Sequence, residues 1–250
     1  GSRMMNGPTQ QCQYRLMKVT NLKQLALEFV VIFLGVSASF GVTSFSQIRF
    51  EKAEENRLLK ALATEIETIR IYEARASRDV SDDIAIYSEL LKSEGMSDGA
   101  LGAVTSSKTR IEFSLFNNSL FSPPTETYTT LIASDGLKYI RSNTLKMALT
   151  NLHIRSQSRV TAGLAEERLL KSTLLDEFLS KHPSFLIQAS DPNVSVDEYL
   201  DTLSHILLEN QTVRAALGMQ LKYLKSKKAA LQLYELSLGD LETALKRTRS

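Results

Sequence analysis

The side chains that most often carry catalysis are scattered along this sequence. His153, His182 and His205 lie far apart, and no HExxH motif or helix-spaced pair brings two histidines together. Ser172 and Ser204 lack the glycine-flanked turn of a nucleophilic serine, and the chain has no glycine-rich phosphate-binding loop. The pattern therefore predicts a protein that is not an enzyme and needs no cofactor or metal.

Two acidic pairs and one cysteine are the remaining candidates for chemistry. The pairs Asp82-Asp83 and Glu166-Glu167 are more simply interpreted as solvated helix faces. Cys12 is the only cysteine, which excludes an internal disulfide and a cysteine-based metal site. A catalytic site assembled from distant residues is the alternative that this pattern leaves open.

A long apolar stretch, Gln24 to Ile48, carries a single charged side chain, Glu28. About 20 helical residues cross the ~30 Å hydrocarbon core of a bilayer, so this stretch is long enough to span it. The alternatives are a buried helix of a soluble protein and a signal peptide with small residues near Ser37. We expect an uncleaved anchor, because the run is longer than a signal core and continues into a charged helical segment.

The faces of this helix suggest more than an anchor. At about 100° per residue, Glu28, Gly35, Ser39 and Ser46 fall within one narrow stripe. A carboxyl group in a membrane normally faces a bundle interior or a water-filled path. The stripe therefore predicts that these four residues line a pore in a homo-oligomer.

A second strip of small residues lies nearly opposite the first and consists of Ser37, Gly41 and Ser44. Small residues allow close approach of helices, so these three are predicted to be helix-packing positions. The alternative is that the Ser and Thr hydroxyls only bond to carbonyls of their own helix.

The rest of the chain is predicted to be mainly α. Leu, Ala, Lys and Glu are abundant, whereas the 250 residues contain only five prolines and eleven glycines. The fold class is an N-terminal transmembrane helix continuing into a long stalk helix, followed by an antiparallel helical bundle domain. The expected divisions are a tag remnant (Gly1 to Arg3) with a polar N-terminus (1–20), the transmembrane helix (21–49), an acidic stalk helix (50–93), a loop with a possible short extended segment (94–124) and the bundle (125–250).

The stalk carries a narrow apolar stripe formed by Leu58, Leu62, Ile66 and Ile69. Such a stripe packs against something, either the rest of its own domain or the same helix of neighbouring subunits. The sequence leaves both open.

Turn signals then divide the chain. The glycine-containing stretch SEGMSDGALG (93–102) indicates an exposed loop, and Ile111, Phe113 and Leu115 alternate with polar residues as in a short extended piece. Short-range signals mark a helix start after Pro123-Pro124, a stop at Ser134-Asp135-Gly136 and a cap at Ser142 or Asn143.

Three further helices are expected before the C-terminus. They are a run from Asn143 to His182 ended by Pro183, a helix opened by the capping box Ser195 and Glu198 and running through Leu208, and a last helix from Gln211. In the last helix, leucines recur at seven-residue spacing, at Leu217, Leu224, Leu231, Leu238 and Leu245. The companion positions four residues on are Leu221, Lys228, Glu235 and Glu242, which favours an antiparallel bundle over a free coiled coil.

Basic side chains predict a polyanion-binding surface. Residues 211–250 hold eight Lys and Arg against three Asp and Glu, a net charge of +5. Nucleic acid or anionic lipid head groups are the expected ligands, and the alternative is a solvated helix surface. The residues proposed for binding are Lys222, Lys225, Lys227, Lys228, Arg155 and Arg159.

Several of these positions carry a resemblance to known proteins. The anchor followed by RFEKAEENRLLKALATEIE, and then Tyr128, Leu131, Ser134, Gly136, Leu137, Ile140, Leu145 and Leu149, resembles a family of bacterial single-span membrane proteins. That resemblance implies an architecture but no activity, and this chain has Ser46 and Gln47 where the family has a Trp. In layout alone the chain is also similar to membrane effectors of antiphage systems such as Hailong, which implies an oligomeric, nucleic-acid-gated channel.

Two functions of different classes follow. The first is a homo-oligomeric pore-forming effector in the bacterial inner membrane, gated by the helical domain and acting in antiphage defence. The second is a passive anchor that presents a helical domain to a protein partner. Three basic residues precede the span and four follow it closely, which favours a cytoplasmic helical domain.

Overall fold

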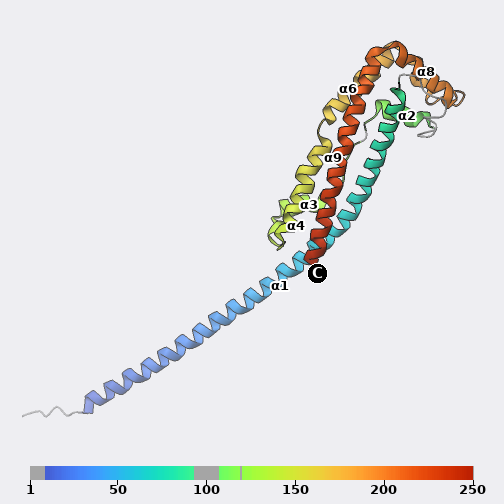
Figure 1. The fold of residues 1–250 in the computed structure, drawn as a ribbon. Coiled ribbons are helices and arrows are strands. Elements are labelled where there is room, and N and C mark those ends of the chain that lie inside the picture. Colours follow the sequence, from blue (N-terminus) through green and yellow to red (C-terminus); the bar gives the residue numbers. More distant parts are fainter. Residues whose placement is uncertain (1–8, 93–106, 119, 250) are drawn as a thin grey trace, which may run out of the picture. The chain divides into compact units, whose positions relative to one another are not determined.

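The structure is a computed structural model that describes residues 9–92, 107–118 and 120–249, with side chains from residue 24 onward. Every regular element in these ranges is a helix, which confirms the mainly α class (Figure 1). The chain divides into two compact units, Gly1–Asn56 and Arg57–Ser250. The predicted tag remnant and the glycine-containing loop at 93–102 lie outside the described residues.

Helix α1 (Thr9–Leu90) contains both the apolar stretch and the stalk, as predicted. It has no proline, and good helix formers dominate its second half. After the helix ends, the Leu91 carbonyl accepts a hydrogen bond from the Arg214 guanidinium at 3.1 Å. A cation is favourable at this position because the C-terminus of a helix carries partial negative charge.

The apolar stripe of the stalk packs within its own domain. Leu58, Leu62, Ile66 and Ile69 are at most 4% exposed and belong to the core of the second unit. On the same side of the helix, the Glu65 carboxylate accepts the backbone N–H of Thr127 at 2.6 Å. The stripe is therefore covered by the bundle, and of the two partners that the sequence left open, the chain's own domain is the one observed.

Helix α2 (Lys108–Phe116) replaces the extended segment predicted here. Ser107 caps the helix by accepting the N–H of Arg110, and the buried residues Ile111, Ser114 and Leu115 follow helical spacing. The alternation of Ile111, Phe113 and Leu115 was misleading because Phe113 is 46% exposed on the outer face. The prediction of a short extended piece is therefore wrong.

The next three elements are short and follow the predicted turn signals. They are α3 (Glu126–Ala133), the 3-10 turn η1 (Gly136–Lys138) and α4 (Asn143–Thr150). Asp135 adopts a left-handed conformation (φ 52°) between α3 and η1, and the Ser142 side chain accepts the N–H of Leu145 to cap α4. The predicted stop and cap are confirmed.

The run predicted from Asn143 to His182 is interrupted. After α4 come η2 (Asn151–Ser156), a π-helical stretch, then α5 (Gln157–Thr161) and α6 (Leu164–Lys181). Gly163 has φ 78°, and a Cβ built on it would lie 2.5 Å from Cε2 of Tyr223. The break therefore depends on glycine at this position, where the chain needs a left-handed residue against an aromatic ring.

The last three helices are α7 (Pro183–Gln188), α8 (Val196–Glu209) and α9 (Gln211–Arg249). Ser195 accepts the N–H of Glu198, so the predicted start of α8 is confirmed. Helices α4, η2, α5, α6 and α8 all pack on α9, and α9 runs between α6 and the second half of α1 (Figure 1). Contacts of α1 with α9 pair Leu91 with Arg214 and Arg70 with Glu242, so these two helices are antiparallel.

The seven-residue leucine repeat of α9 is buried, but its companion positions are three residues on, not four. The five leucines are at most 5% exposed. The residues three positions after the first four of them are buried too, namely Gln220, Lys227, Tyr234 and Leu241. The positions predicted as companions, Leu221, Lys228, Glu235 and Glu242, lie at the edge of the seam or are exposed. The prediction of a helix packed in an antiparallel bundle is confirmed.

Candidate functional site

The apolar segment of the first unit has no covering within the described chain. Every side chain from Gln24 to Phe50 is exposed, including large apolar ones such as Phe29 (70%), Phe40 (70%) and Val42 (71%). A segment with these residues is long and apolar enough to cross a membrane. Apolar surfaces of this extent are normally buried or in lipid, so the segment is a candidate membrane span.

The four residues predicted to line a path are all exposed on α1. The Ser39 hydroxyl donates to the Gly35 carbonyl at 2.8 Å, and the Thr43 hydroxyl donates to the Ser39 carbonyl at 2.8 Å. Glu28 and Ser46 lie on the same stripe of the helix. The hydroxyl groups of Ser39 and Thr43 therefore donate their hydrogen atoms within their own helix. Their oxygen lone pairs can still accept a hydrogen bond or coordinate an ion.

The three predicted packing residues, Ser37, Gly41 and Ser44, are exposed as well. A Cβ built on Gly35 or on Gly41 would meet nothing within 4 Å in this chain. Both faces are thus open to a neighbouring helix from outside the chain. Their roles in the pore and in packing stay predictions.

The C-terminal end of the apolar stretch carries an aromatic-cation contact. The Arg49 guanidinium lies 4.4 Å from the ring centroid of Phe45. Aromatic and basic side chains are typical of the region where a membrane helix leaves the hydrocarbon core. This contact indicates where the candidate span ends.

The polyanion-binding prediction is wrong for one of its residues. Lys227 is 6% exposed and its ammonium lies 3.1 Å from the Glu167 carboxylate. Lys222 and Lys225 are exposed and Lys228 is half-buried, so these three remain on the surface of α9. Lys227 cannot contact a polyanion because the bundle covers it.

The two predicted arginines lie on other elements. Arg155 is on η2 and Arg159 on α5, and both are exposed. The hydroxyl groups of Ser156 and Ser237 are 2.8 Å apart, which places this part of η2 beside the later half of α9. At about 1.5 Å per residue, Ser237 lies about 13 Å along α9 from Lys228, so Arg155 does not join the lysines in one compact patch.

Glu167 and two lysines form a buried charged network that the sequence did not reveal. Glu167 is 1% exposed, and its second oxygen lies 3.7 Å from the Lys171 ammonium, which also donates to the Asn117 carbonyl at 2.5 Å. Gln220 donates to the Glu167 carbonyl at 3.1 Å. Burial lowers the pKa of Lys171, and the neighbouring Glu167 carboxylate partly opposes this.

The interpretation of both acidic pairs as solvated faces was therefore half wrong. Glu166 and Asp82 are exposed, but Glu167 and Asp83 are buried. The Asp83 carboxylate lies 2.5 Å from the Arg110 guanidinium, beside a cavity of about 420 Å³ between α1, α2, Asn118 and residues 120–122. In each pair one member is buried because another helix packs over it, α2 over Asp83 and α9 over Glu167. The residues adjacent in sequence do not specify which helix packs there.

The three histidines lie on different elements, His153 on η2, His182 at the end of α6 and His205 on α8. His153 stacks on Tyr128 with ring centroids 4.4 Å apart, and burial lowers its pKa to about 4. Across the described ranges no group of three His, Cys, Asp or Glu side chains could hold a metal ion. The prediction that the chain is not an enzyme stays a prediction.

No protein-family model matches this chain, and no curated protein or solved structure matches it. The resemblances drawn from the sequence therefore stay predictions. The turn that carries one of them is well formed, since Leu131, Ile140, Leu145 and Leu149 are fully buried around Asp135 and η1.

Proposed function

We propose that this chain is a single-span membrane protein whose copies assemble through Gln24 to Ile48, so that Glu28, Gly35, Ser39 and Ser46 line a path for ions. The observation that carries the proposal is the open face of α1. It holds the only charged side chain of the apolar stretch, and no described part of the chain covers it.

The energetic argument starts from Glu28. A carboxylate at the centre of a membrane helix is unfavourable by roughly 2.5–3.5 kcal/mol on insertion scales, and less towards the membrane edge. One helix alone offers no partner for it. Several copies that turn this face towards one another place the carboxylates around shared water, which lowers that penalty.

The same face is shaped for close approach. Gly35 has no side chain, and the hydroxyls of Ser39 and Thr43 are folded back onto the helix. Small residues of this kind let neighbouring helices make van der Waals contact at the edges of the path while the middle of the stripe stays open to water. In lipid such contact drives association, because the hydrophobic effect no longer does. The helical bundle of the second unit is then the part that responds to a trigger, for which a nucleic acid or a protein partner is the expected class.

The second candidate is a passive anchor or scaffold. It is favoured by the same two hydrogen bonds, because Ser39 and Thr43 are satisfied without any partner helix. In that case the span fixes the bundle at a membrane for a protein partner.

For either function we propose the bacterial inner membrane with a cytoplasmic bundle, on the weak excess of basic residues after the span. A role in antiphage defence is proposed only on the resemblance in layout described in the sequence analysis.

Oxidative cross-linking in membranes tests which face meets its copies. In a Cys12→Ser background, Ser39→Cys places one thiol on the proposed path, and Phe33→Cys places one away from it. We expect disulfide-linked dimers of Ser39→Cys and few of Phe33→Cys. Equal yields from the two variants, or none from either, would contradict assembly through this face.

A further inference from the structure

Charge is unevenly distributed along the bundle of the second unit. Three of its segments, 57–64, 136–150 and 243–249, contain eight Lys and Arg and no Asp or Glu. We call the end of the bundle that they form the basic end; its basic residues are Arg57, Lys60, Lys138, Arg141, Lys146, Lys246, Arg247 and Arg249.

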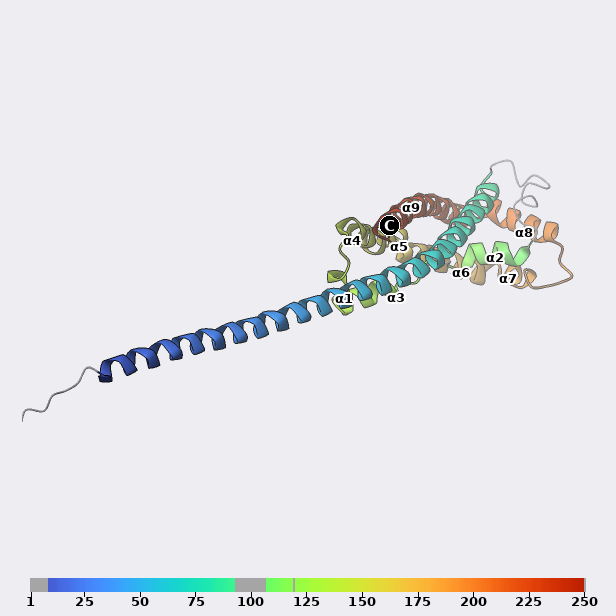
Figure 2. The same ribbon diagram turned by 90° about the horizontal axis from the view of Figure 1, so that it is seen from below.

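The fold brings these three segments to one place. Arg70 of α1 pairs with Glu242 of α9 at 2.6 Å, and the helices are antiparallel. From that pair, α1 runs back about 15 Å to Lys60 while α9 runs forward about 10 Å to Arg249, in the same direction. Helix α4 packs on α9, and both views show α4 and the C-terminus at the same end of the bundle (Figures 1 and 2).

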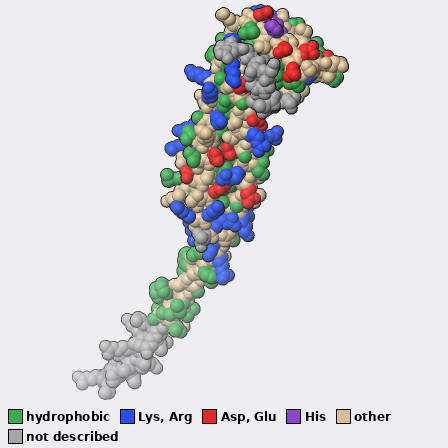
Figure 3. All heavy atoms as spheres, turned by 45° about the vertical axis from the view of Figure 1, so that its right-hand side comes forward, with side chains coloured by type: hydrophobic (Ala, Val, Ile, Leu, Met, Phe, Trp, Pro, Cys, Tyr) green, Lys and Arg blue, Asp and Glu red, His purple; other side chains and the backbone are tan. Residues whose placement is uncertain are grey.

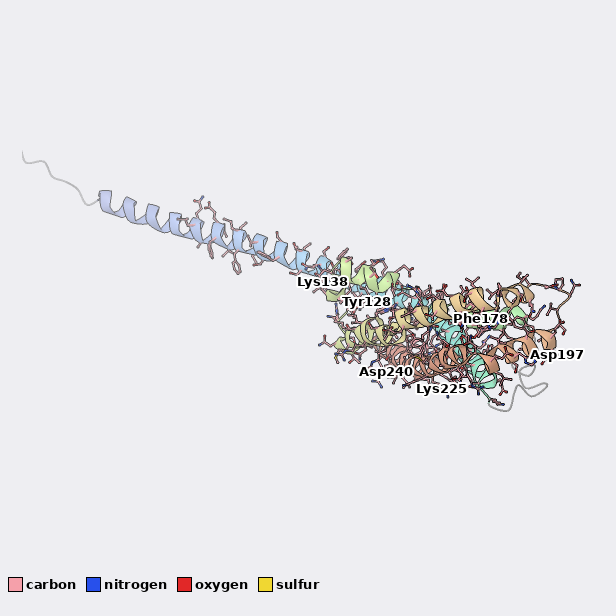
Figure 4. The ribbon with its side chains drawn as sticks, turned by 90° about the horizontal axis from the view of Figure 1, so that it is seen from above. Tyr128, Lys138, Phe178, Asp197, Lys225 and Asp240 are labelled. Atoms are coloured by element: carbon pink, nitrogen blue, oxygen red, sulfur yellow. The ribbon has the colours of Figure 1, made fainter. Side chains whose placement is uncertain are left out.

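The opposite end of the bundle is acidic. Residues 183–209, which form α7 and α8, contain five Asp and Glu and no Lys or Arg. Figure 4 shows Lys138 at one end of the bundle and Asp197 at the other. In the space-filling view, Lys and Arg are frequent on the lower part of the bundle, and Asp and Glu gather on α8 at the far end (Figure 3).

Acidic groups near the basic end offset part of its charge. Asp135 pairs with Lys138 at 3.2 Å, Glu126 is exposed, and Glu65 is buried against Thr127. Residues 51–56, which precede the bundle in the chain, hold three glutamates and one lysine. The basic end keeps a net positive charge after these are counted.

We infer that the basic end binds anionic phospholipid head groups at the membrane surface from which the chain emerges. This inference rests on the membrane anchoring in the proposed function, but not on an ion path. Arg57 follows Arg49 by only eight residues in the chain, so the covalent connection keeps this end within reach of the head groups. The acidic end is at the other extreme, where it avoids repulsion by the same surface.

The shape of the surface favours lipid over nucleic acid. The charges are spread over three segments, and none of them lines either of the two hollows described in the bundle. A broad set of charges suits many mobile head groups. Each Lys or Arg near an anionic surface strengthens binding about fivefold, within a Debye length of about 10 Å.

Energy transfer from a labelled lipid to the full chain in nanodiscs tests this. In a Cys12→Ser background, a donor dye is placed by Met147→Cys near the basic end or by Leu208→Cys on α8, both exposed positions. The discs contain an acceptor-labelled lipid and either phosphatidylcholine alone or about 30% phosphatidylglycerol. We expect the anionic lipid to raise transfer from position 147 but not from 208, and about 0.5 M salt to reverse the rise.

Two charge-matched variants complete the test. The first triple variant removes three charges from the basic end and carries Lys60→Gln, Lys246→Gln and Arg249→Gln. It should lower the ratio of docked to undocked bundle about 100-fold. The second triple variant removes three charges from the middle of α9 and carries Lys222→Gln, Lys225→Gln and Lys228→Gln. It should change the ratio of docked to undocked bundle little. Transfer that ignores anionic lipid, or falls equally in both variants, overturns the inference. So does binding of an oligonucleotide by the basic end without any lipid effect. Failure of the chain to enter the discs at all would instead contradict the anchoring.

Discussion

The ammonium of Lys227 lies 3.1 Å from the carboxylate of Glu167 inside the bundle, and both side chains are more than nine-tenths buried. Lys171 shares the same carboxylate. One anion thus holds two buried cations, and the network joins α6 to α9. Removing the anion is more damaging than removing either cation, because two charges are then left without their counter-ion.

Glu167→Gln should therefore destabilise the second unit by about 3–5 kcal/mol, the range for breaking a buried ion pair. Glu166→Gln, one residue earlier and exposed, should change stability by less than about 0.5 kcal/mol. Urea unfolding of the full chain in mild detergent, followed by circular dichroism, measures both. Equal stability of the two variants would show that the network does not stabilise the fold.

The features that could be predicted from the sequence are those that depend on residues close together in the chain. The caps at Ser142 and Ser195 and the turn around Asp135 are local, because a hydroxyl or a left-handed residue acts within three positions of itself. The long α1 helix and the leucine repeat of α9 could also be predicted from the sequence, because many residues contribute to their periodicity.

Burial of charge was not predictable in the same way. Lys225, Lys227 and Lys228 are alike in sequence, yet only Lys227 faces Glu167 across the bundle. Counting companions three residues after each leucine, instead of four, would have placed Gln220 and Lys227 in the seam. The extended segment was mispredicted for a related reason: three alternating apolar residues are too few to distinguish a strand from a short helix.

The break before α6 should depend on Gly163. Gly163→Ala should destabilise the protein by roughly 1–3 kcal/mol, because alanine is strained at φ 78° and its Cβ meets Tyr223. Gly218→Ala is the matched control, since Gly218 is within α9 and a Cβ there meets nothing within 4 Å. The free energy of unfolding of Gly218→Ala should rise by about 0.5–1 kcal/mol. Thermal unfolding of both compares them, and a stabilised Gly163→Ala would contradict the account of the break.

Stability should fall in mild acid because of His153. Burial lowers the pKa of His153 from 6.5 to about 4, so between these values the unfolded chain binds a proton that the folded chain does not. Stability present above pH 6.5 is then lost as the pH falls, by about 2–3 kcal/mol at pH 4.

His153→Phe should remove this dependence. Phenylalanine keeps an aromatic ring against Tyr128, and the buried Nδ1 of His153 has no hydrogen-bond partner to lose. Unfolding free energies at several pH values decide the point. An unchanged acid response in the variant would assign it to other groups.

The small residues of the apolar stretch should control assembly. Gly35→Leu or Gly41→Leu should separate the helices and reduce oligomers in mild detergent, because close approach is what glycine permits. Val36→Leu changes bulk at an exposed apolar position that lies on neither small-residue strip, and it serves as the control. Analytical ultracentrifugation reports the oligomer, and a wild-type protein that sediments as a monomer would contradict self-assembly.

Cation current across a planar bilayer containing the full chain tests the proposed path most directly. We expect current through the wild-type protein and a lower cation conductance for Glu28→Gln with the oligomer intact. Ser39→Leu should block the current, because the leucine side chain fills the path. Phe33→Leu, turned away from the stripe, should conduct like the wild type. If neither the wild type nor a sample treated with an oligonucleotide passes current, the span is an anchor and its polar stripe is only a packing face.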